Sequence, residues 1–186
     1  MAHIILLNGQ LLDITLSRLA QELIENHGDF SNSVILGLQP KGTFVASRIQ
    51  RKLASFGIPD VPLGYLDITF YRDDFRRRGT PIKANETHVP FIIEGKQVIL
   101  IDDVLYTGRS VRAAMSAMMA FGRPEKVELL ALIDRKYSRD LPIEPNYIGR
   151  SVNTIESQRV QAQWREQGFD EDHIWLVQGE APTQQS

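Results

Sequence analysis

Short apolar runs alternate with amphipathic segments along most of this chain, and this order restricts its fold more than any other feature. The run 33–38 is followed by a short loop and by apolar residues at helical spacing, namely Val45, Ile49, Leu53 and Phe56. The run 96–101 likewise precedes a helical pattern over 110–121, which carries Val111, Ala114, Met115 and Met118, and a third run spans 127–133. Uninterrupted apolar runs are typical of strands buried on both faces. The sequence therefore predicts an α/β fold, with a mostly parallel sheet flanked by helices.

Two further elements are predicted before the second run. An amphipathic helix is expected over 14–24, with inward apolar residues from Ile14 onward, Asp13 as its cap and His27-Gly28 as its stop. A strand is expected over 64–71. The polar loop that follows it extends to about His88 and has the length of a lid over a binding site.

The chain after Asp134 is less regular. Its short segment 147–149 and its last apolar run, 174–177, predict a small hood or cap. We expect residues 1–180 to form a single domain, because 186 residues is an ordinary length for one core. Residues 181–186 are polar and are expected to form a frayed tail.

Charge and composition exclude several classes of protein. The formal net charge of −2 argues against a protein that coats nucleic acid, and the absence of cysteine excludes disulfides and thiolate chemistry. No apolar run approaches the roughly 20 residues that cross a bilayer. We therefore expect a cytoplasmic protein that does not associate with a membrane.

Asp102 and Asp103 follow the apolar run 96–101 and are candidates for substrate contacts. Ligands of α/β proteins bind at the carboxyl ends of strands, where these two carboxylates are expected. Consecutive side chains of an extended segment point to opposite faces, which argues against a carboxylate pair that shares a proton. Two divergent carboxylates suit the two hydroxyls of a ribose ring, or a cation.

The turn Thr107-Gly108-Arg109-Ser110 stands where the next helix is predicted to begin. Thr107 and Ser110 offer hydroxyl donors, and Gly108 lets the backbone approach a ligand closely. The free amides at a helix N-terminus favour an anion. A solvated acid pair and a helix cap would explain these features one by one, whereas their combination after a buried strand predicts a phosphate site.

The segment 37–43, GLQPKGT, is an alternative phosphate site, because it nearly matches the loop of nucleotide-hydrolysing proteins. That loop requires a lysine directly after its second glycine. Here Thr43 follows Gly42, and Lys41 precedes it. The match therefore fails at the residue that reaches the phosphates.

Residues 98–110, VILIDDVLYTGRS, resemble the phosphoribosyl-pyrophosphate motif of type I phosphoribosyltransferases. The likeness extends to LDITFYRDDFRRR at 66–78, VLYTGRSVRAAM at 104–115, and LIDR with DLPIEPNYIG between 132 and 149. Together these segments resemble the family of bifunctional pyrimidine-operon attenuators and uracil phosphoribosyltransferases. The resemblance implies a type I phosphoribosyltransferase fold and Mg²⁺-dependent transfer of phosphoribosyl from phosphoribosyl pyrophosphate to uracil, giving UMP and pyrophosphate.

The resemblance also implies roles for individual residues. The acidic pair would bind the ribose hydroxyls, the following loop the 5′-phosphate, and segment 40–42 the pyrophosphate. Family members usually have Thr-Arg where Pro40-Lys41 stands, and lysine lacks the planar fork of arginine. The implied substrate-binding residues are Pro40, Lys41, Gly42, Asp102, Asp103, Val104, Leu105, Tyr106, Thr107, Gly108, Arg109 and Ser110. The catalytic residues are Asp102 and Asp103, with Lys41, Arg72 and Arg135 assigned to the charge of the leaving group.

Four further roles follow from the resemblance. Arg135 would lie beside the base, and Asp134 next to it is a candidate metal ligand. Val160 would read the base through its backbone from the hood. Residues 69–78 would begin the lid. We also expect a homodimer or a higher homo-oligomer.

Binding of the leader RNA of pyrimidine genes is a further implied role. Ser17, Arg18 and Arg150 match positions that the family uses for RNA, but Gln21 stands where histidine is common. The loop 136–139 also lacks the usual histidine and carries one extra residue. Two alternatives to uracil transfer stay open: an RNA-binding regulator with little catalysis, and a phosphoribosyltransferase for another base such as a purine.

Overall fold

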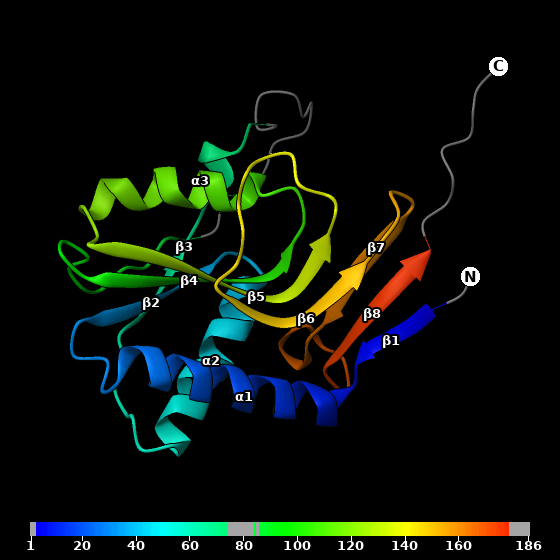
Figure 1. Cartoon of the computed structure of the whole chain (residues 1–186), viewed down its shortest axis with the longest axis horizontal. Coiled ribbons are helices and arrows are strands. Elements are labelled where there is room, and N and C mark those ends of the chain that lie inside the picture. The colour runs from blue at the N-terminus through cyan, green and yellow to red at the C-terminus, as the bar shows by residue number, and fades with distance from the viewer. Residues whose placement is uncertain (1–2, 74–83, 85, 179–186) are drawn as a thin grey trace.

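The computed structural model describes residues 3–73, 84 and 86–178. They form a five-stranded parallel sheet with helices on both faces and a separate three-stranded sheet beside it (Figure 1). The predicted tail 181–186 and residues 74–83, which include most of the predicted lid, lie outside the described residues. Within the described ranges, every helix is too short or too polar to cross a membrane.

The central sheet has the strand order β3-β2-β4-β5-β6, and all neighbouring strands are parallel. Because the strands are parallel, their carboxyl ends lie at one edge of the sheet. The α/β prediction is confirmed. The strands are β2 (Ser33–Leu38), β3 (Leu63–Leu66), β4 (Gln97–Leu105), β5 (Lys126–Lys136) and β6 (Tyr147–Asn153).

Helices cover both faces of this sheet, with α1 (Gly9–His27) and α2 (Gly42–Ser55) on one side and α3 (Arg109–Met118) on the other (Figure 1). The side chains of β4 alternate between two cores. Ile99 and Ile101 pack in the core that contains α1 and α2, whereas Val98 and Leu100 pack against α3. Burial of both faces explains why the strand is apolar without interruption.

The two ends of the chain build the second sheet, which is antiparallel and has the order β1-β8-β7. Its strands are β1 (His3–Leu7), β7 (Gln158–Gln163) and β8 (His173–Gln178). Figure 1 shows these strands in blue, orange and red beside β6. This sheet is the predicted hood. The sequence did not predict β1 or β7, and segment 147–149 belongs to β6 of the central sheet instead.

The predicted strand over 64–71 is wrong in its second half. β3 ends at Leu66, and the short 3₁₀ helix η1 (Thr69–Tyr71) follows. The Asp67 carboxylate accepts hydrogen bonds from the amide and the hydroxyl of Thr69, at 3.1 and 2.6 Å. This local turn competes with extended backbone and ends the strand.

The predicted start of the first helix is also wrong. α1 begins at Gly9, because the side chain of Asn8 accepts a hydrogen bond from the amide of Leu11 at 2.9 Å and caps the helix before Asp13. The predicted stop is confirmed, since α1 ends at His27.

Three apolar residues assigned to inner helix faces are exposed instead, namely Ile14 at 57%, Phe56 at 42% and Met115 at 44%. Phe56 is the C-cap residue of α2, where the helix passes the edge of the core. α3 ends at Met118, and the 3₁₀ helix η3 (Met119–Phe121) continues it.

Candidate active site

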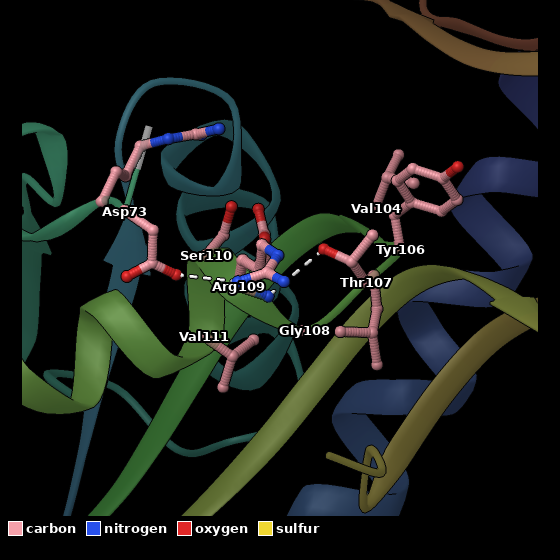
Figure 2. A pocket seen from close by; sticks show the side chains of 11 residues that line it. Asp73, Val104, Tyr106, Thr107, Gly108, Arg109, Ser110 and Val111 are labelled. Atoms are coloured by element: carbon pink, nitrogen blue, oxygen red, sulfur yellow. Dashed lines mark hydrogen bonds and ion pairs between the residues drawn. The ribbon is translucent and has the colours of Figure 1, made fainter. Parts of the chain in front are cut away.

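A cleft lies at the carboxyl edge of the central sheet. Two cavities of about 390 and about 180 Å³ form it. Arg72, Asp102, Val104 and Ser110 line both cavities, so these cavities are parts of one cleft. Figure 2 shows the larger cavity, which is also lined by Asp73, Leu105, Tyr106, Thr107, Gly108, Arg109 and Val111.

The larger cavity lies at the N-terminus of α3. Gly108 is the N-cap residue of this helix and has a φ of 91°, which a residue without Cβ adopts at little cost. A Cβ at Gly108 would also lie 3.2 Å from the side chain of Ile143. The first amides of α3 and the side chains of Thr107 and Ser110 therefore meet at one cavity, where an anion is favoured.

The guanidinium of Arg109 is already paired within this site. It contacts the carboxylates of Asp73 and Asp140 at 3.0 Å each, and the ion pair with Asp73 is visible in Figure 2. Arg112 holds the other carboxylate oxygen of Asp73. The main chain of Arg109, rather than its guanidinium, is therefore the part that suits an anion in the cavity.

Segment 139–143 packs against the turn 106–108 at the start of α3. The amide of Asp140 donates to the carbonyl of Thr107 at 2.9 Å, and Arg139 donates to the carbonyl of Tyr106 at 2.8 Å. No sequence pattern indicates this contact, because Tyr106 and Arg139 are 33 residues apart.

Asp102 and Asp103 lie within β4 and not after a strand, because the pairing with β5 continues to Leu105. The amide of Asp103 donates to the carboxylate of Asp102, and the amide of Val104 donates to that of Asp103, both at 2.9 Å. Both carboxyl groups line the smaller cavity, and they interact with each other. Strand alternation predicts that the two side chains diverge, whereas both residues line the smaller cavity.

The acidic pair is held in an unfavourable environment for its charge. Burial raises the pKa of Asp102 well above its usual range, and the charge of Asp103 raises it further, whereas Arg72 lowers it. Burial also raises the pKa of Asp103, against the opposing effects of a hydrogen bond with Asp102 and of the charge of Lys41. Hydroxyl donors or a cation bound in the cleft would stabilise the charged form.

Segment 40–42 connects β2 to α2 and packs directly on β4. A Cβ at Gly42 would lie 2.5 Å from the carbonyl oxygen of Ile101 and 3.1 Å from the Cα of Asp102. Only glycine therefore lets the first turn of α2 come this close to the acidic pair. The structure brings the predicted pyrophosphate segment and the predicted ribose acids together.

Lys41 and Arg72 supply positive charge at the smaller cavity, which both residues line. The charge of Lys41 acts on Asp103, and its Nζ lies 3.4 Å from the carbonyl of Ala162 in the hood. Lys41 therefore lies between the acidic pair and β7.

Arg135 connects the end of β5 with the hood. Its guanidinium donates to the hydroxyl of Thr154 and to the carbonyl of Gln158, both at 2.9 Å. The same group stacks on Tyr106, with Cζ 3.8 Å from the ring centroid. Burial lowers the pKa of Arg135. Two of its nitrogens are thus already partnered on the hood side of the cleft.

The other two residues predicted near the base are Asp134, which directly precedes Arg135 on β5, and Val160 on β7. Asp134 is buried and forms an ion pair with Arg139, which supplies positive charge to its carboxylate. Val160 lies half-buried on β7 and packs against the core. Groups of three or more His, Cys, Asp or Glu side chains that could hold a metal ion are absent from the described part of the chain.

The three residues predicted to contact RNA lie on α1 and β6. Each of them has a partner within the chain. Their side chains donate to main-chain carbonyls, Ser17 to Asp13, Arg18 to Gly149 and Arg150 to Leu6. The contact of Ser17 lies within α1, whereas those of Arg18 and Arg150 connect α1 and β1 with β6.

The fold of the chain is that of the phosphoribosyltransferases. The structure of the hypoxanthine phosphoribosyltransferase of Trypanosoma cruzi matches with a TM-score of 0.70 and 13% identity, over 95% of this chain and 97% of that chain. A hypoxanthine phosphoribosyltransferase from Staphylococcus aureus matches with a TM-score of 0.67 and 16% identity, over 96% and 93%. At these identities the likeness concerns the fold.

Sequence comparisons identify the family. Residues 5–167 match the family model of the phosphoribosyl transferase domain. Over 171 residues the chain is 42% identical to the bifunctional protein PyrR of Halalkalibacterium halodurans, covering 90% of this chain and 94% of that protein. It is 40% identical to the bifunctional protein PyrR of Enterococcus faecalis, covering 88% and 90%. The chain therefore belongs to the PyrR family of phosphoribosyltransferases. The predicted resemblance is confirmed, and the nucleotide-hydrolysing alternative loses its support.

Proposed function

We propose that this protein transfers the phosphoribosyl group of phosphoribosyl pyrophosphate to uracil, giving UMP and pyrophosphate. The observation that carries the proposal is the interacting acidic pair, Asp102 and Asp103, in a cleft that also contains the N-terminus of α3. Membership of the PyrR family supports it.

The larger cavity suits the 5′-phosphate, and the ribose is assigned to the junction of the two cavities, where Asp102 lines both and Asp103 lines the smaller one. The first amides of α3 and the hydroxyls of Thr107 and Ser110 donate to an anion there. The carboxylates of Asp102 and Asp103 accept hydrogen bonds from the two ribose hydroxyls, and such charge-assisted bonds are roughly twice as strong as neutral ones. Burial raises the pKa of each acid in the free protein, and bound hydroxyl donors or a cation are expected to lower it again.

The smaller cavity suits the pyrophosphate leaving group. Its departure leaves positive charge on the ribose, so the site has to stabilise negative charge on the leaving oxygens. We assign Lys41 and Arg72 to this role, because both line the cavity beside the acidic pair. Mg²⁺ would add positive charge to the pyrophosphate oxygens when bound. Asp102 and Asp103 fit this ion better than Asp134, whose carboxylate is already paired with Arg139.

The base is assigned to the space between the cleft and the hood. Arg135, stacked on Tyr106, forms one wall of it. Val160 lies on β7, which is an edge strand of the hood sheet as described. Alternate main-chain groups of an edge strand have no strand partner, so they can bind the polar edge of a base. This arrangement supports base recognition by the backbone of β7.

An assay of the purified protein with phosphoribosyl pyrophosphate and Mg²⁺ tests the proposal. We expect kcat/KM for uracil to exceed those for hypoxanthine, guanine, adenine and orotate by about tenfold or more, since each base presents a different polar edge. Product formation is followed by chromatography. A higher kcat/KM for a purine would mean that the substrate is another base than uracil. Turnover of none of the five bases would favour a regulator with little catalysis.

The bifunctional relatives motivate a second proposal, which is that the protein also binds the leader RNA of pyrimidine genes, with modest selectivity. The side chains of Ser17, Arg18 and Arg150 already have partners within the chain, and contacts to phosphate alone give salt-dependent, sequence-indifferent binding. In gel-shift titrations at physiological salt, we expect a leader hairpin to bind less than about tenfold more tightly than a scrambled hairpin. Tight, UMP-dependent preference for the leader hairpin would contradict this expectation.

A further inference from the structure

The side chain of Arg48 connects helix α2 with the hood. Among the described residues, the hood sheet and the central sheet have no strand in common. Arg48 lies on α2, about two turns after Lys41. Its side chain is only 11% exposed, and its carboxylate partners, Glu166 and Asp172, lie beyond β7 in the sequence. It therefore connects the helix that begins at the pyrophosphate segment with the hood.

Five hydrogen bonds and one ring contact hold the guanidinium of Arg48. Two nitrogens donate to the two carboxylate oxygens of Glu166 at 2.8 Å each, which is the bidentate geometry of arginine. Two nitrogens donate to one oxygen of Asp172, at 2.7 and 3.2 Å. A fifth bond goes to the carbonyl of Phe44 at 3.1 Å. The guanidinium also stacks on Trp164, with Cζ 4.6 Å from the ring centroid.

These partners fix the connection between β7 and β8. Trp164 directly follows β7 and is fully buried, and Glu166 lies in the 3₁₀ helix η4 (Arg165–Gln167). Asp172 directly precedes β8 and also accepts a hydrogen bond from the amide of Arg165, at 2.8 Å. The contact with Arg48 lowers the pKa of Glu166, so the ion pair is charged over the neutral pH range. Arg48 thus holds both strands at one end of the hood.

Two other side chains also reach the main chain of β7. Lys41 reaches the carbonyl of Ala162 at 3.4 Å, and Arg135 reaches the carbonyl of Gln158 at 2.9 Å. Lys41 lines the cleft, and Arg135 is assigned to the base in the proposed function. Arg48 differs from them because it lies outside the cleft, and it holds the end of β7 next to Ala162.

We propose that Arg48 is a positioning residue for the transfer reaction, which places the base-binding strand β7 at its working distance from the pyrophosphate segment. The inference rests on the proposed function, in which β7 reads the base and segment 40–42 binds the pyrophosphate. A small displacement between two reacting groups lowers the rate strongly, so the orientation of the hood affects catalysis without contact to the substrate.

The test compares Arg48→Lys and Glu166→Gln with the wild-type protein. Lysine keeps the charge of Arg48 but has neither its planar fork nor its stacking surface. We expect the KM for the base to rise and kcat to fall, with kcat/KM for the base reduced about tenfold or more. The Kd of phosphoribosyl pyrophosphate, measured by calorimetry without base, is expected to stay within about twofold, because the phosphate loop is not attached to the hood through Arg48.

Lys52→Gln is the matched control. Lys52 lies on the same helix and forms an ion pair with Asp13 of α1 at 2.6 Å, and neither residue belongs to the hood. The control is expected to keep the wild-type KM for the base and the wild-type Kd. Its unfolding temperature shows how much the loss of an ion pair on α2 changes stability alone.

Several outcomes overturn the inference. Variants that are folded and keep the wild-type KM and kcat for the base would make Arg48 purely structural. Parallel increases in the KM for the base and the Kd of phosphoribosyl pyrophosphate would do the same. If Arg48→Lys does not fold, Glu166→Gln decides, since it keeps the contacts of Arg48 with Asp172 and Trp164. The comparison uses whichever base the wild-type protein turns over. A preference for another base therefore contradicts the assignment of uracil and leaves the role of Arg48 testable. A wild-type protein that turns over no base overturns both proposals.

Discussion

Replacing Asp102 by asparagine is expected to reduce kcat/KM about tenfold to one-hundredfold while the ligand-free protein becomes as stable as the wild type or more stable. A neutral amide is a weaker acceptor for ribose hydroxyls, and hydrogen bonds to charged groups contribute about 1.5–3 kcal/mol. The amide oxygen can still accept the hydrogen bond from the amide of Asp103, so the local backbone is kept. Steady-state kinetics and thermal unfolding at neutral pH measure the two effects.

The gain in stability follows from the raised pKa of Asp102. A carboxyl group with a higher pKa in the folded state binds more protons there than in the unfolded chain, so its contribution to stability falls as the pH rises from its usual pKa through the raised one. Asp102→Asn should remove this part of the pH dependence. The exposed residue Asp170 provides a control, and Asp170→Asn is expected to change neither quantity. Wild-type activity in Asp102→Asn, or a large loss of stability, would show that the acid is structural.

The central sheet and the turn that starts α3 could be predicted from the sequence because their signals are local. β2, β4 and β5 are buried on both faces and therefore appear as apolar runs. The turn at Gly108 and the helix that follows it are likewise encoded by neighbouring residues. Sequence patterns describe such strand, loop and helix units well, since each depends on contacts within a short stretch of chain.

The hood could be predicted only in outline, since it pairs distant segments. β1 and β8 come from opposite ends of the chain, and His3 pairs with Val177. β7 has the sequence QRVQAQ, in which only Val160 and Ala162 are apolar, so its signal is weak. The contacts between the hood and the rest of the molecule join distant residues. Arg48 and Asp172, for example, are 124 positions apart. No pattern of spacing identifies such a pair.

The electrostatic state of the site was the other feature that the sequence did not predict. Strand alternation predicts Asp102 and Asp103 on opposite faces, whereas both residues line the smaller cavity, and each carboxylate accepts a hydrogen bond from the amide that follows it. The partner of Asp134, which is Arg139, and one of the two carboxylate partners of Arg109, which is Asp140, also come from the later segment 139–143. The types of residue in a site are thus visible in the sequence, but their protonation and pairing depend on the packed structure.

Replacing Gly42 by alanine is expected to reduce kcat/KM about one-hundredfold and to lower the free energy of unfolding by about 1–3 kcal/mol. The added Cβ would lie 2.5 Å from the carbonyl oxygen of Ile101 and 3.1 Å from the Cα of Asp102. Both of these atoms belong to the backbone of a central strand, so the first turn of α2 has to move away from β4. That movement carries Lys41 away from Asp103 and separates the pyrophosphate segment from the ribose acids.

Gly9→Ala is the matched control for this prediction, because Gly9 is also the first residue of a long helix. A Cβ at Gly9 has its nearest neighbour, the carbonyl oxygen of Asp172, at 3.9 Å, which is an ordinary contact. Alanine there is expected to keep full activity and to stabilise the protein by up to about 1 kcal/mol through the unfolded chain. Kinetics and chemical unfolding of the two variants separate a general effect of losing a helical glycine from the specific effect of filling this contact. Wild-type kinetics in Gly42→Ala would show that close packing of α2 against β4 is not needed, and that the pyrophosphate segment acts at a greater distance from the acidic pair.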